Sequence, residues 1–278
     1  MTTILDGKKI QEIIVLKLKK KIGLAHNKPA LVIIQIGNLK ESTMYVDKKK
    51  ILGKKIGARV IHTIYPINTA QKKIVADIQA HNTDSKIHGI MIQLPIPKTY
   101  STQTLLDAII PEKDVDGLTS KNTKLLFINK EYFLPATTRG ILTLLKDYKI
   151  PIKGKKVVIV GASQLVGKPT ALAFLNRKAT VTICTLHTKN LAKETRQAEI
   201  LIVATGHTQL ITPEHVSGGQ ILIDVGITIS ENKKITGDVA YAVVKPIVKA
   251  ITPVPGGVGP MTVVSLFENL LDAWRNKF

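Results

Sequence analysis

Hydrophobic residues recur along the first half of the chain with two different periods. Between Gly7 and His26, isoleucine and leucine return every three to four residues with lysines between them, which predicts an amphipathic helix. Short runs rich in β-branched residues, typical of strands, follow at 31–36, 59–64 and 89–94. Two further helices are predicted between these runs, one capped by Ser42 and one over 71–81. Strands that alternate with helices predict a parallel α/β sheet.

The same alternation resumes after Pro151–Gly154. Apolar runs that we expect to be strands covered on both faces lie at 156–160, 180–184, 200–204 and 220–224. The first of them leads through a turn at 161–167 into a helix through 171–175, and a last helix is predicted over 263–277. A chain of 278 residues suits two domains of about 100–200 residues each, so we predict two α/β lobes, the second of them Rossmann-like.

The composition and charge of the chain limit the kinds of molecule that it is expected to bind. The formal charge of +20 raises the question of nucleic-acid binding, but the lysines are spread through the chain and aromatic residues, at 4%, are too few for base stacking. We therefore expect no specific nucleic-acid binding, although such a field would steer small anions. No apolar run reaches the roughly 18–20 residues of a membrane span, and the N-terminus lacks the pattern of a signal peptide. One cysteine, Cys184, excludes an internal disulfide, and we expect it to lie in the core of a cytoplasmic protein.

A glycine-containing turn, Gly161-Ala-Ser-Gln-Leu-Val-Gly167, leads from a predicted strand into a helix. Backbone amides at such a helix start bind the phosphates of a dinucleotide. The turn departs from G-x-G-x-x-G, because Ser163 takes the place of the second glycine and Gly167 falls one residue after the third. A purely structural turn therefore stays open. The next strand ends without a carboxylate, and His187 and Lys189 follow it, which favours NADP over NAD.

Four residues of the first half combine groups suited to acid–base chemistry. Tyr45 and Lys49 are four residues apart and share one face of the predicted helix. Gln93 ends a strand, and Asp116 precedes a glycine. Each also has a structural interpretation, with Tyr45 in the core, Lys49 in solvent and Asp116 in a turn. No His, Cys or Asp cluster has the spacing of metal ligands, so no metal site is expected.

The loop Thr252–Thr262 holds three prolines and three glycines in eleven residues. Proline fixes φ and glycine permits close approach of a flat ligand, so the composition predicts a rigid, pre-shaped surface. A tight turn between domains is the alternative.

Seven short motifs occur in order along the chain: YVDKK at 45–49, QLP at 93–95, EKDVDGL at 112–118, GASQLVGKP at 161–169, DVGI at 224–227, GDVA at 237–240 and TPVPGGVGPMT at 252–262. With them the chain resembles the bifunctional methylenetetrahydrofolate dehydrogenase/methenyltetrahydrofolate cyclohydrolase family along essentially its whole length. The resemblance implies a homodimer and a C-terminal helix that returns to the first lobe. It divides the chain into a folate-binding catalytic domain at 1–120 plus 262–278, a connecting segment at 121–150 and a Rossmann-like NAD(P)-binding domain at 151–261.

The resemblance also implies an activity, the oxidation of 5,10-methylenetetrahydrofolate with NADP and hydrolysis of the methenyl product to 10-formyltetrahydrofolate. Lys49 would be the general acid/base, held by a hydrogen bond with Gln93, while Tyr45 would stack on the folate and Asp116 would accept hydrogen bonds from the pterin. A free lysine has a pKa of about 10.4, so catalysis near neutrality requires a decrease of about three units, or roughly 4 kcal/mol. The residues implied as further folate contacts are Pro255, Gly256 and Gly257, and those implied for the cofactor are Gly161, Ala162, Ser163, Gly167 and Ile227.

Two departures from the family pattern concern the cofactor. Ala162 stands where some members have arginine, and Thr185-Leu186 stands where many have His-Ser, so NAD remains open beside NADP. The alternatives are a monofunctional or NAD-preferring dehydrogenase, a basic nucleic-acid-binding protein, and a Rossmann dehydrogenase of another small substrate. We expect the positive charge to favour polyglutamylated folates. A side chain at Gly256 or Gly257 is expected to weaken folate binding more than folding.

Overall fold

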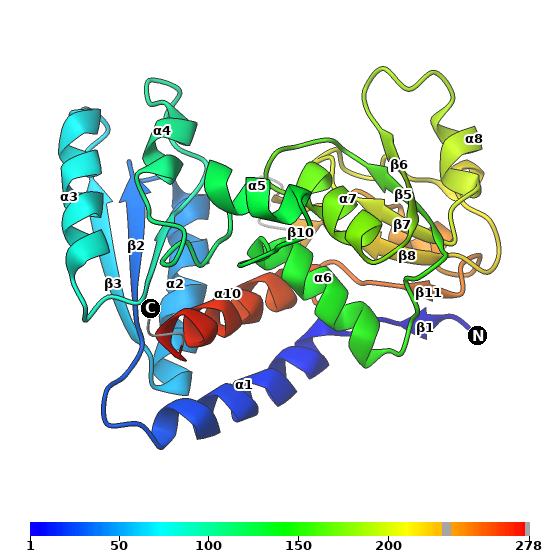
Figure 1. Ribbon diagram of the computed structural model, residues 1–278. Helices are drawn as coiled ribbons and strands as arrows, with labels where there is room; N and C mark the ends of the chain where they lie inside the picture. The colour runs from blue at the N-terminus through cyan, green and yellow to red at the C-terminus, as the bar shows by residue number, and fades with distance from the viewer. Residues whose placement is uncertain (230–234, 276–278) are drawn as a thin grey trace. The chain divides into compact units, whose positions relative to one another are not determined.

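The computed structural model describes residues 1–229 and 235–275, and these form two compact units (Figure 1). One unit contains residues 1–11 and 137–262, and the other contains residues 12–136 and the segment from Val263 onward. Each unit has its own parallel sheet with helices packed on it, which confirms the predicted α/β class. The C-terminal helix groups with the first-half unit from Val263 on, as expected.

The unit around residues 12–136 is built on three parallel strands in the order β3-β2-β4, which are Arg59–Tyr65, Ala30–Ile36 and Gly89–Ile92. One face of this sheet is apolar and packs against α3 (Gln71–Thr83) and α4 (Thr102–Asp107). Ile34, Ile74 and Leu105 are fully buried in that layer. Figure 1 shows α3 beside the strands, on the left of the view.

The other face of this sheet is covered by α2 (Lys40–Ile56) and α10 (Val258–Arg275). The packing is close, since a Cβ on Gly53 of α2 would collide with Val60 of β3 and one on Gly89 of β4 would approach Leu270 of α10. The remaining helices with residues in this unit are α1 (Gly7–Gly23) and α5 (Ser120–Phe127). Helix α2 is therefore held closely against the sheet.

Two predictions about helix ends are wrong. Ser42 does not cap α2, because the helix already begins at Lys40 and Ser42 lies buried in its first turn. The last helix begins at Val258 rather than at 263, because proline is tolerated in a first helical turn and Pro260 occupies that turn. Its predicted end at 277 lies outside the described residues.

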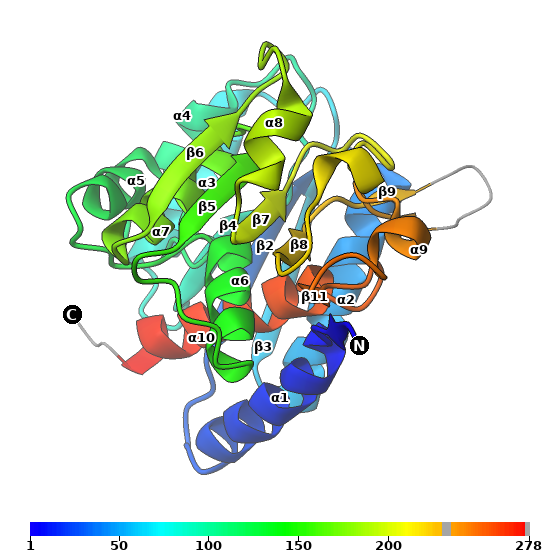
Figure 2. The same cartoon turned by 90° about the vertical axis from the view of Figure 1, so that its right-hand side faces the viewer.

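The other unit is built on six parallel strands in the order β1-β11-β8-β7-β5-β6 (Figure 2). In that order they are Thr3–Ile4, Ala250–Ile251, Ile221–Asp224, Ile200–Val203, Lys156–Val160 and Thr180–Cys184. A short antiparallel pair, β9 and β10, joins Thr228–Ile229 to Ile235–Thr236. The helical elements are α6 (Ala136–Asp147), α7 (Gly167–Asn176), α8 (Leu191–Arg196), η1 (Pro213–His215) and α9 (Tyr241–Val244).

Strand β6 differs from its prediction. It lies at the sheet edge and three of its five residues are exposed, so the expectation that it is covered on both faces is wrong. An edge strand keeps an unpaired side and alternates exposed with buried positions. Cys184 at its end is buried in the core beside Val160, as predicted.

The bounds of the two units also differ from the predicted division. Residues 1–11 group with the six-stranded sheet because Thr3 N donates to Lys249 O (2.9 Å) and Leu5 N donates to Ile251 O (2.8 Å). Residues 121–136 group with the first-half unit, where Asn269 Nδ2 of α10 donates to Leu134 O (3.0 Å). Hydrogen bonds between segments distant in sequence decide both assignments.

Candidate active site

Lys49 and Gln93 form a buried pair at the carboxyl end of the three-stranded sheet. Lys49 lies on α2 and is 8% exposed, and its Nζ donates to Gln93 Oε1 over 2.7 Å. Gln93 follows β4, and its Nε2 donates to Leu94 O (2.7 Å), which fixes the orientation of the amide. Burial lowers the pKa of Lys49, and the negative charge of Asp116 opposes this shift. The amine is therefore aimed, and its neutral form is favoured relative to a lysine in water.

A second glutamine anchors the helix that carries Lys49. Gln35 lies beside Gln93 in the sheet, since Ile34 pairs with Ile92 one position earlier. Gln35 Nε2 donates to Thr43 Oγ1 in the first turn of α2 (3.1 Å), and its Oε1 accepts from His62 Nε2 (3.1 Å). Because Tyr45 lies two residues after Thr43, this contact holds the turn that presents Tyr45.

Tyr45 lies half-buried on α2, one turn before Lys49. Lys48 Nζ lies 5.2 Å from the centroid of the Tyr45 ring, which is within the range of a cation–π interaction. The ring is therefore part of a charged surface. Ser42, one turn earlier, is buried, and its hydroxyl has no hydrogen-bond partner among the described residues. The sequence pointed to Ser42 only as a cap.

Asp116 is presented by a turn that its neighbour Asp114 holds in shape. The Asp114 carboxylate is buried and accepts hydrogen bonds from the backbone amides of Gly117 (3.0 Å) and Thr119 (2.8 Å). Asn122 Nδ2 donates to the same carboxylate (2.8 Å). Burial raises the pKa of Asp116 to about 6, while the nearby Lys49 charge lowers it. Asp114 thus shapes the turn, and Asp116 supplies a partly buried acid close to Lys49.

The turn after β5 is shaped by its two glycines. Gly161 has φ +111°, and a Cβ there would collide with Ala204 O at the end of β7. A Cβ on Gly167 would collide with Gly161 O, so the start of α7 packs directly on the end of the strand. Ser163 Oγ accepts from the backbone amides of Val166 (3.2 Å) and Gly167 (3.4 Å). Ala162 lies between these residues and is partly exposed.

Two buried acids connect the neighbouring strand ends in the same unit. Asp224, at the end of β8, accepts from the backbone amides of Gly226 (3.0 Å) and Val239 (3.0 Å). Asp238 Oδ2 accepts from Thr205 N (2.6 Å) and Gly206 N (3.0 Å), just after β7. Burial raises the pKa of Asp224 to about 7, against the lowering effect of these amides. The sequence contained both acids in its DVGI and GDVA motifs but gave no sign that they face inward.

The loop after β11 is rigid for internal reasons. Gly257 N donates to Pro253 O (2.8 Å), and a Cβ on Gly257 would lie 2.7 Å from both Pro253 O and Thr252 Cβ. Gly256 has φ +115° and its carbonyl accepts from Lys8 N (3.0 Å). Pro255, directly before the two glycines, follows a cis peptide bond. Both glycines are therefore required by the loop itself, and the expectation that a side chain at either position weakens folate binding more than folding stays a prediction.

Comparison with known proteins agrees with both halves of this geometry. Residues 5–116 match the catalytic domain of tetrahydrofolate dehydrogenase/cyclohydrolase, and residues 135–278 match its NAD(P)-binding domain. The chain belongs to the tetrahydrofolate dehydrogenase/cyclohydrolase family. The resemblance inferred from the motifs is confirmed.

Curated members of this family cover the chain nearly end to end. The bifunctional protein FolD of Ruthia magnifica subsp. Calyptogena magnifica is 40% identical over 274 residues, which are 99% of each chain. A FolD crystal structure from Campylobacter jejuni is 39% identical, covers 100% of both chains and has a TM-score of 0.98. A Trypanosoma brucei FolD, solved with NADP cofactor and an inhibitor, is 31% identical, covers 99% of this chain and 97% of its own, and has a TM-score of 0.94.

In this family member, the predicted residues divide between the two units. Tyr45, Lys49, Gln93 and Asp116 lie in the first-half unit, where Lys49 contacts Gln93 directly and shares an electrostatic interaction with Asp116. The predicted residues in the other unit are Gly161, Ala162, Ser163, Gly167, Ile227, Pro255, Gly256 and Gly257. Ile227 is 37% exposed, next to the end of β8.

Residues 1–229 and 235–275 also bear on metal binding and on membrane spans. Within these ranges, no three His, Cys, Asp or Glu side chains are grouped as metal ligands would be. In the same ranges, every helix is too short or too polar to cross a bilayer.

Proposed function

We propose that Lys49 is the general acid/base of this enzyme and that NADP is its oxidant. The family activity is the oxidation of 5,10-methylenetetrahydrofolate to the methenyl compound, followed by hydrolysis to 10-formyltetrahydrofolate. The observation that carries the proposal is the buried hydrogen bond between Lys49 Nζ and Gln93 Oε1. A lysine that is desolvated and aimed by a neutral acceptor suits proton transfer near neutral pH.

The neutral Lys49 amine removes a proton from the water that attacks the methenyl carbon. As lysinium, it then returns that proton to the ring nitrogen that leaves when the bridge opens, while the hydroxyl of the intermediate releases its proton to solvent as the formyl C=O forms. Gln93 keeps the amine in place because its Oε1 accepts without adding a charge, so the pKa of Lys49 stays low. An acid at position 93 would hold the lysine protonated.

Asp116 and Tyr45 bind and orient the folate in this proposal. Above about pH 6 the Asp116 carboxylate is ionised and accepts hydrogen bonds from the donor-rich edge of the pterin. Tyr45 offers a half-buried ring for stacking. Pro255, Gly256 and Gly257 remain proposed folate contacts, and their support is the fixed shape of their loop.

The turn after β5 fits a dinucleotide. A bound NADP would supply the hydride acceptor for the oxidation. Gly161 and Gly167 bring the start of α7 directly against the end of β5, the arrangement in which a helix start can lie beside the phosphates of a dinucleotide. Gly161, Ala162, Ser163 and Gly167 would hold these phosphates, and Ile227 would contact the nicotinamide.

The choice of NADP rests on exposed basic residues after β6. His187 and Lys189 are exposed there, where a 2′-phosphate would lie, and the segment carries no acid. The NADP-bound relative from Trypanosoma brucei supports the same choice. NAD is the alternative, because Ala162 and Thr185-Leu186 lack the basic side chains of other members.

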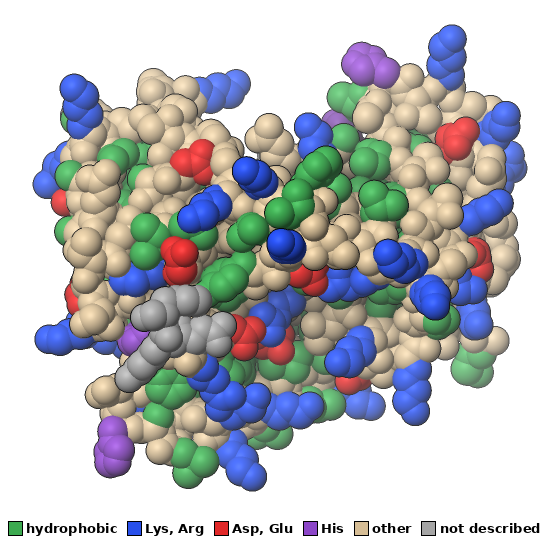
Figure 3. Space-filling model, viewed as in Figure 1, with side chains coloured by type: hydrophobic (Ala, Val, Ile, Leu, Met, Phe, Trp, Pro, Cys, Tyr) green, Lys and Arg blue, Asp and Glu red, His purple; other side chains and the backbone are tan. Residues whose placement is uncertain are grey.

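Three further properties follow from family membership and charge. We propose a homodimer in the cytoplasm, and substrates that carry polyglutamate tails. Lysine and arginine side chains lie across the whole face seen in Figure 3, so the positive field is broad. Light scattering tests the dimer, and comparison of mono- and polyglutamylated folate at low salt tests the tail.

One experiment tests both activities. The enzyme is supplied with 5,10-methylenetetrahydrofolate and either NADP or NAD, and the reduced cofactor, methenyl product and formyl product are followed together. We expect reduced cofactor with NADP at a higher kcat/KM than with NAD, followed by formyl product. Turnover with neither cofactor would contradict the proposal, and methenyl product without formyl product would leave only the dehydrogenase.

A further inference from the structure

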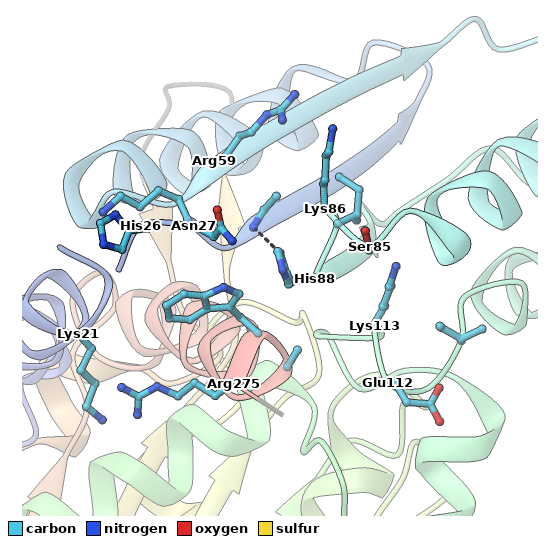
Figure 4. Close-up of a pocket in the computed structure, with 16 residues that line it drawn as sticks. Lys21, His26, Asn27, Arg59, Ser85, Lys86, His88, Glu112, Lys113 and Arg275 are labelled. Atoms are coloured by element: carbon cyan, nitrogen blue, oxygen red, sulfur yellow. Dashed lines mark hydrogen bonds between the residues drawn. The ribbon is translucent and has the colours of Figure 1, made fainter. Parts of the chain in front are cut away.

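A large pocket lies at the amino-terminal edge of the three-stranded sheet, away from the Lys49–Gln93 pair. Its volume is about 1380 Å³, and it is lined by residues at the starts of the strands, Ala30 of β2, Arg59 of β3 and His88 before β4 (Figure 4). His88 and Gln93 flank β4, so five residues at about 3.3 Å each place the two sites roughly 16 Å apart. The pocket is therefore separate from the proposed folate site, and it lies wholly within one unit.

The lining of this pocket is far more basic than the chain as a whole. Six of the sixteen lining residues are lysine or arginine, against 40 of 278 in the sequence, and the only acid among the sixteen is Glu112. Two histidines, His26 and His88, add further nitrogen donors. A general excess of lysine does not account for this concentration, because Lys and Arg are more than twice as frequent in the pocket as in the chain.

Two of the six cations are fixed by backbone carbonyls. Lys28 Nζ donates to Ile22 O (3.0 Å) and Ala25 O (2.8 Å) at the end of α1. Lys113 Nζ donates to His81 O (3.0 Å) and Asp84 O (2.7 Å) after α3. Each of these two lysines keeps its positive charge at the pocket surface and holds a neighbouring loop in place.

The other four cations are exposed and come from four different segments. Lys21 belongs to α1, Arg59 to β3, Lys86 to the loop before β4, and Arg275 to α10. In Figure 4, Lys21 and Arg275 lie below and Arg59 and Lys86 lie above in the view. Like charges gathered around one hollow repel one another, and an anion in the hollow would remove that repulsion.

The pocket also has an apolar and aromatic wall. Ile87, Ile110, Ala273 and Trp274 line it, and Trp274 is the single tryptophan of the sequence. An indole beside several cations suits a ligand with both a flat group and negative charge. The volume is also much larger than one phosphate ion requires.

We propose that this pocket binds a small anion that carries two or more phosphate groups, either a nucleoside polyphosphate or an inorganic oligophosphate. Arg59 and Lys86 bind phosphate oxygens from one side, and Lys21 and Arg275 bind them from the other. Arginine pairs with two phosphate oxygens at once, and lysine acts as a point charge. The site is independent of the nicotinamide cofactor, which the turn after β5 would bind.

Trp274 makes the test direct, because its fluorescence reports the pocket and no other tryptophan competes. The enzyme is titrated with tripolyphosphate at constant ionic strength and without NADP, with tryptophan emission as the readout. We expect a saturable change in emission. The double variant Arg59→Gln/Lys86→Gln should weaken this binding about tenfold or more. The control Lys19→Gln/Lys124→Gln removes the same charge from exposed positions outside the pocket and should bind as the wild type does.

A parallel titration with a nucleoside triphosphate distinguishes the two candidate ligands, a nucleoside polyphosphate and an inorganic oligophosphate. Tighter binding than tripolyphosphate would mean that the base contacts the Trp274 wall, and equal binding would mean that phosphate alone is recognised; both results support the site. The proposal is overturned if emission does not saturate, or if the two double variants bind equally. Tetraglutamate binding as tightly as tripolyphosphate would overturn the assignment to phosphate. None of these readouts depends on folate turnover, so the outcome is distinct from that of the proposed function.

Discussion

Lys49 Nζ donates a hydrogen bond to Gln93 Oε1 over 2.7 Å inside a buried contact between α2 and the end of β4. Gln93→Met keeps the volume and removes the acceptor, so the amine loses its direction. Because small misplacements of a catalytic group cost up to about 10²-fold in rate, we expect cyclohydrolase kcat to decrease about 10- to 100-fold. Binding of NADP should be unchanged. Gln79→Met, at an exposed position on α3, is the matched control, and equal activity of the two variants would contradict the role of Gln93.

Asp116 is expected to set the pH at which Lys49 becomes active. Its negative charge raises the pKa of Lys49, whereas burial lowers it. Asp116→Asn removes the charge, so the pKa of Lys49 falls further and more of the amine is neutral at a given pH. The rising limb of the cyclohydrolase kcat profile should then move to lower pH. The measurement uses saturating folate, because the same change weakens pterin binding; an unmoved limb, or one moved to higher pH, would refute the coupling.

Asp224 is expected to make folding stability depend on pH. Its pKa is raised to about 7 in the folded state, against about 3.9 for an unfolded chain, so the folded state retains a proton that the unfolded state has lost. Its contribution to the free energy of unfolding therefore decreases as pH rises from about 4 to about 7. Asp224→Asn should flatten this slope in urea titrations. Asp147→Asn, at an exposed position, should keep the wild-type slope, and identical slopes for both variants would contradict the prediction.

Substitution of the loop glycines is expected to reduce stability. Gly257→Ala places a Cβ 2.7 Å from Pro253 O and Thr252 Cβ, which should cost about 1–3 kcal/mol in the free energy of unfolding. Gly256→Ala forces φ +115° on alanine at a similar cost. Gly218→Ala is the control, since its Cβ would meet nothing closer than 3.9 Å. Wild-type stability with loss of folate binding would instead support the expectation drawn from sequence.

The alternating strands and helices were predicted well from the sequence, because buried parallel strands are short continuous apolar runs. Strand β2, for example, is buried at all seven of its positions. The prediction that β6 is covered on both faces failed, because the apolar residues of an edge strand resemble those of a central strand. The position of a strand in the sheet is set by the topology of the chain and not by local composition. The sequence also gave no sign of the parallel pairing of β1 with β11, which joins segments about as distant as the chain allows.

Among the site residues, motifs located the groups but not their surroundings. The contact between Lys49 and Gln93 was expected from the resemblance and is present. The motif EKDVDGL holds two acids, and only the fold shows that four hydrogen-bond donors turn Asp114 inward. Asp224 and Asp238 gave no local signal, because Val239 N donates to Asp224 and Thr205 N donates to Asp238 from segments distant in the sequence. Periodicity cannot report such contacts.

The central claim is that Lys49 transfers the proton in the cyclohydrolase step. The most direct test measures hydrolysis of 5,10-methenyltetrahydrofolate by Lys49→Met, together with its affinity for NADP. Lys55→Met, an exposed lysine on the same helix, serves as control. We predict that Lys49→Met binds NADP as the wild type does and hydrolyses the substrate no faster than buffer alone, while Lys55→Met stays fully active. Undiminished hydrolysis by Lys49→Met would remove Lys49 from its proposed role.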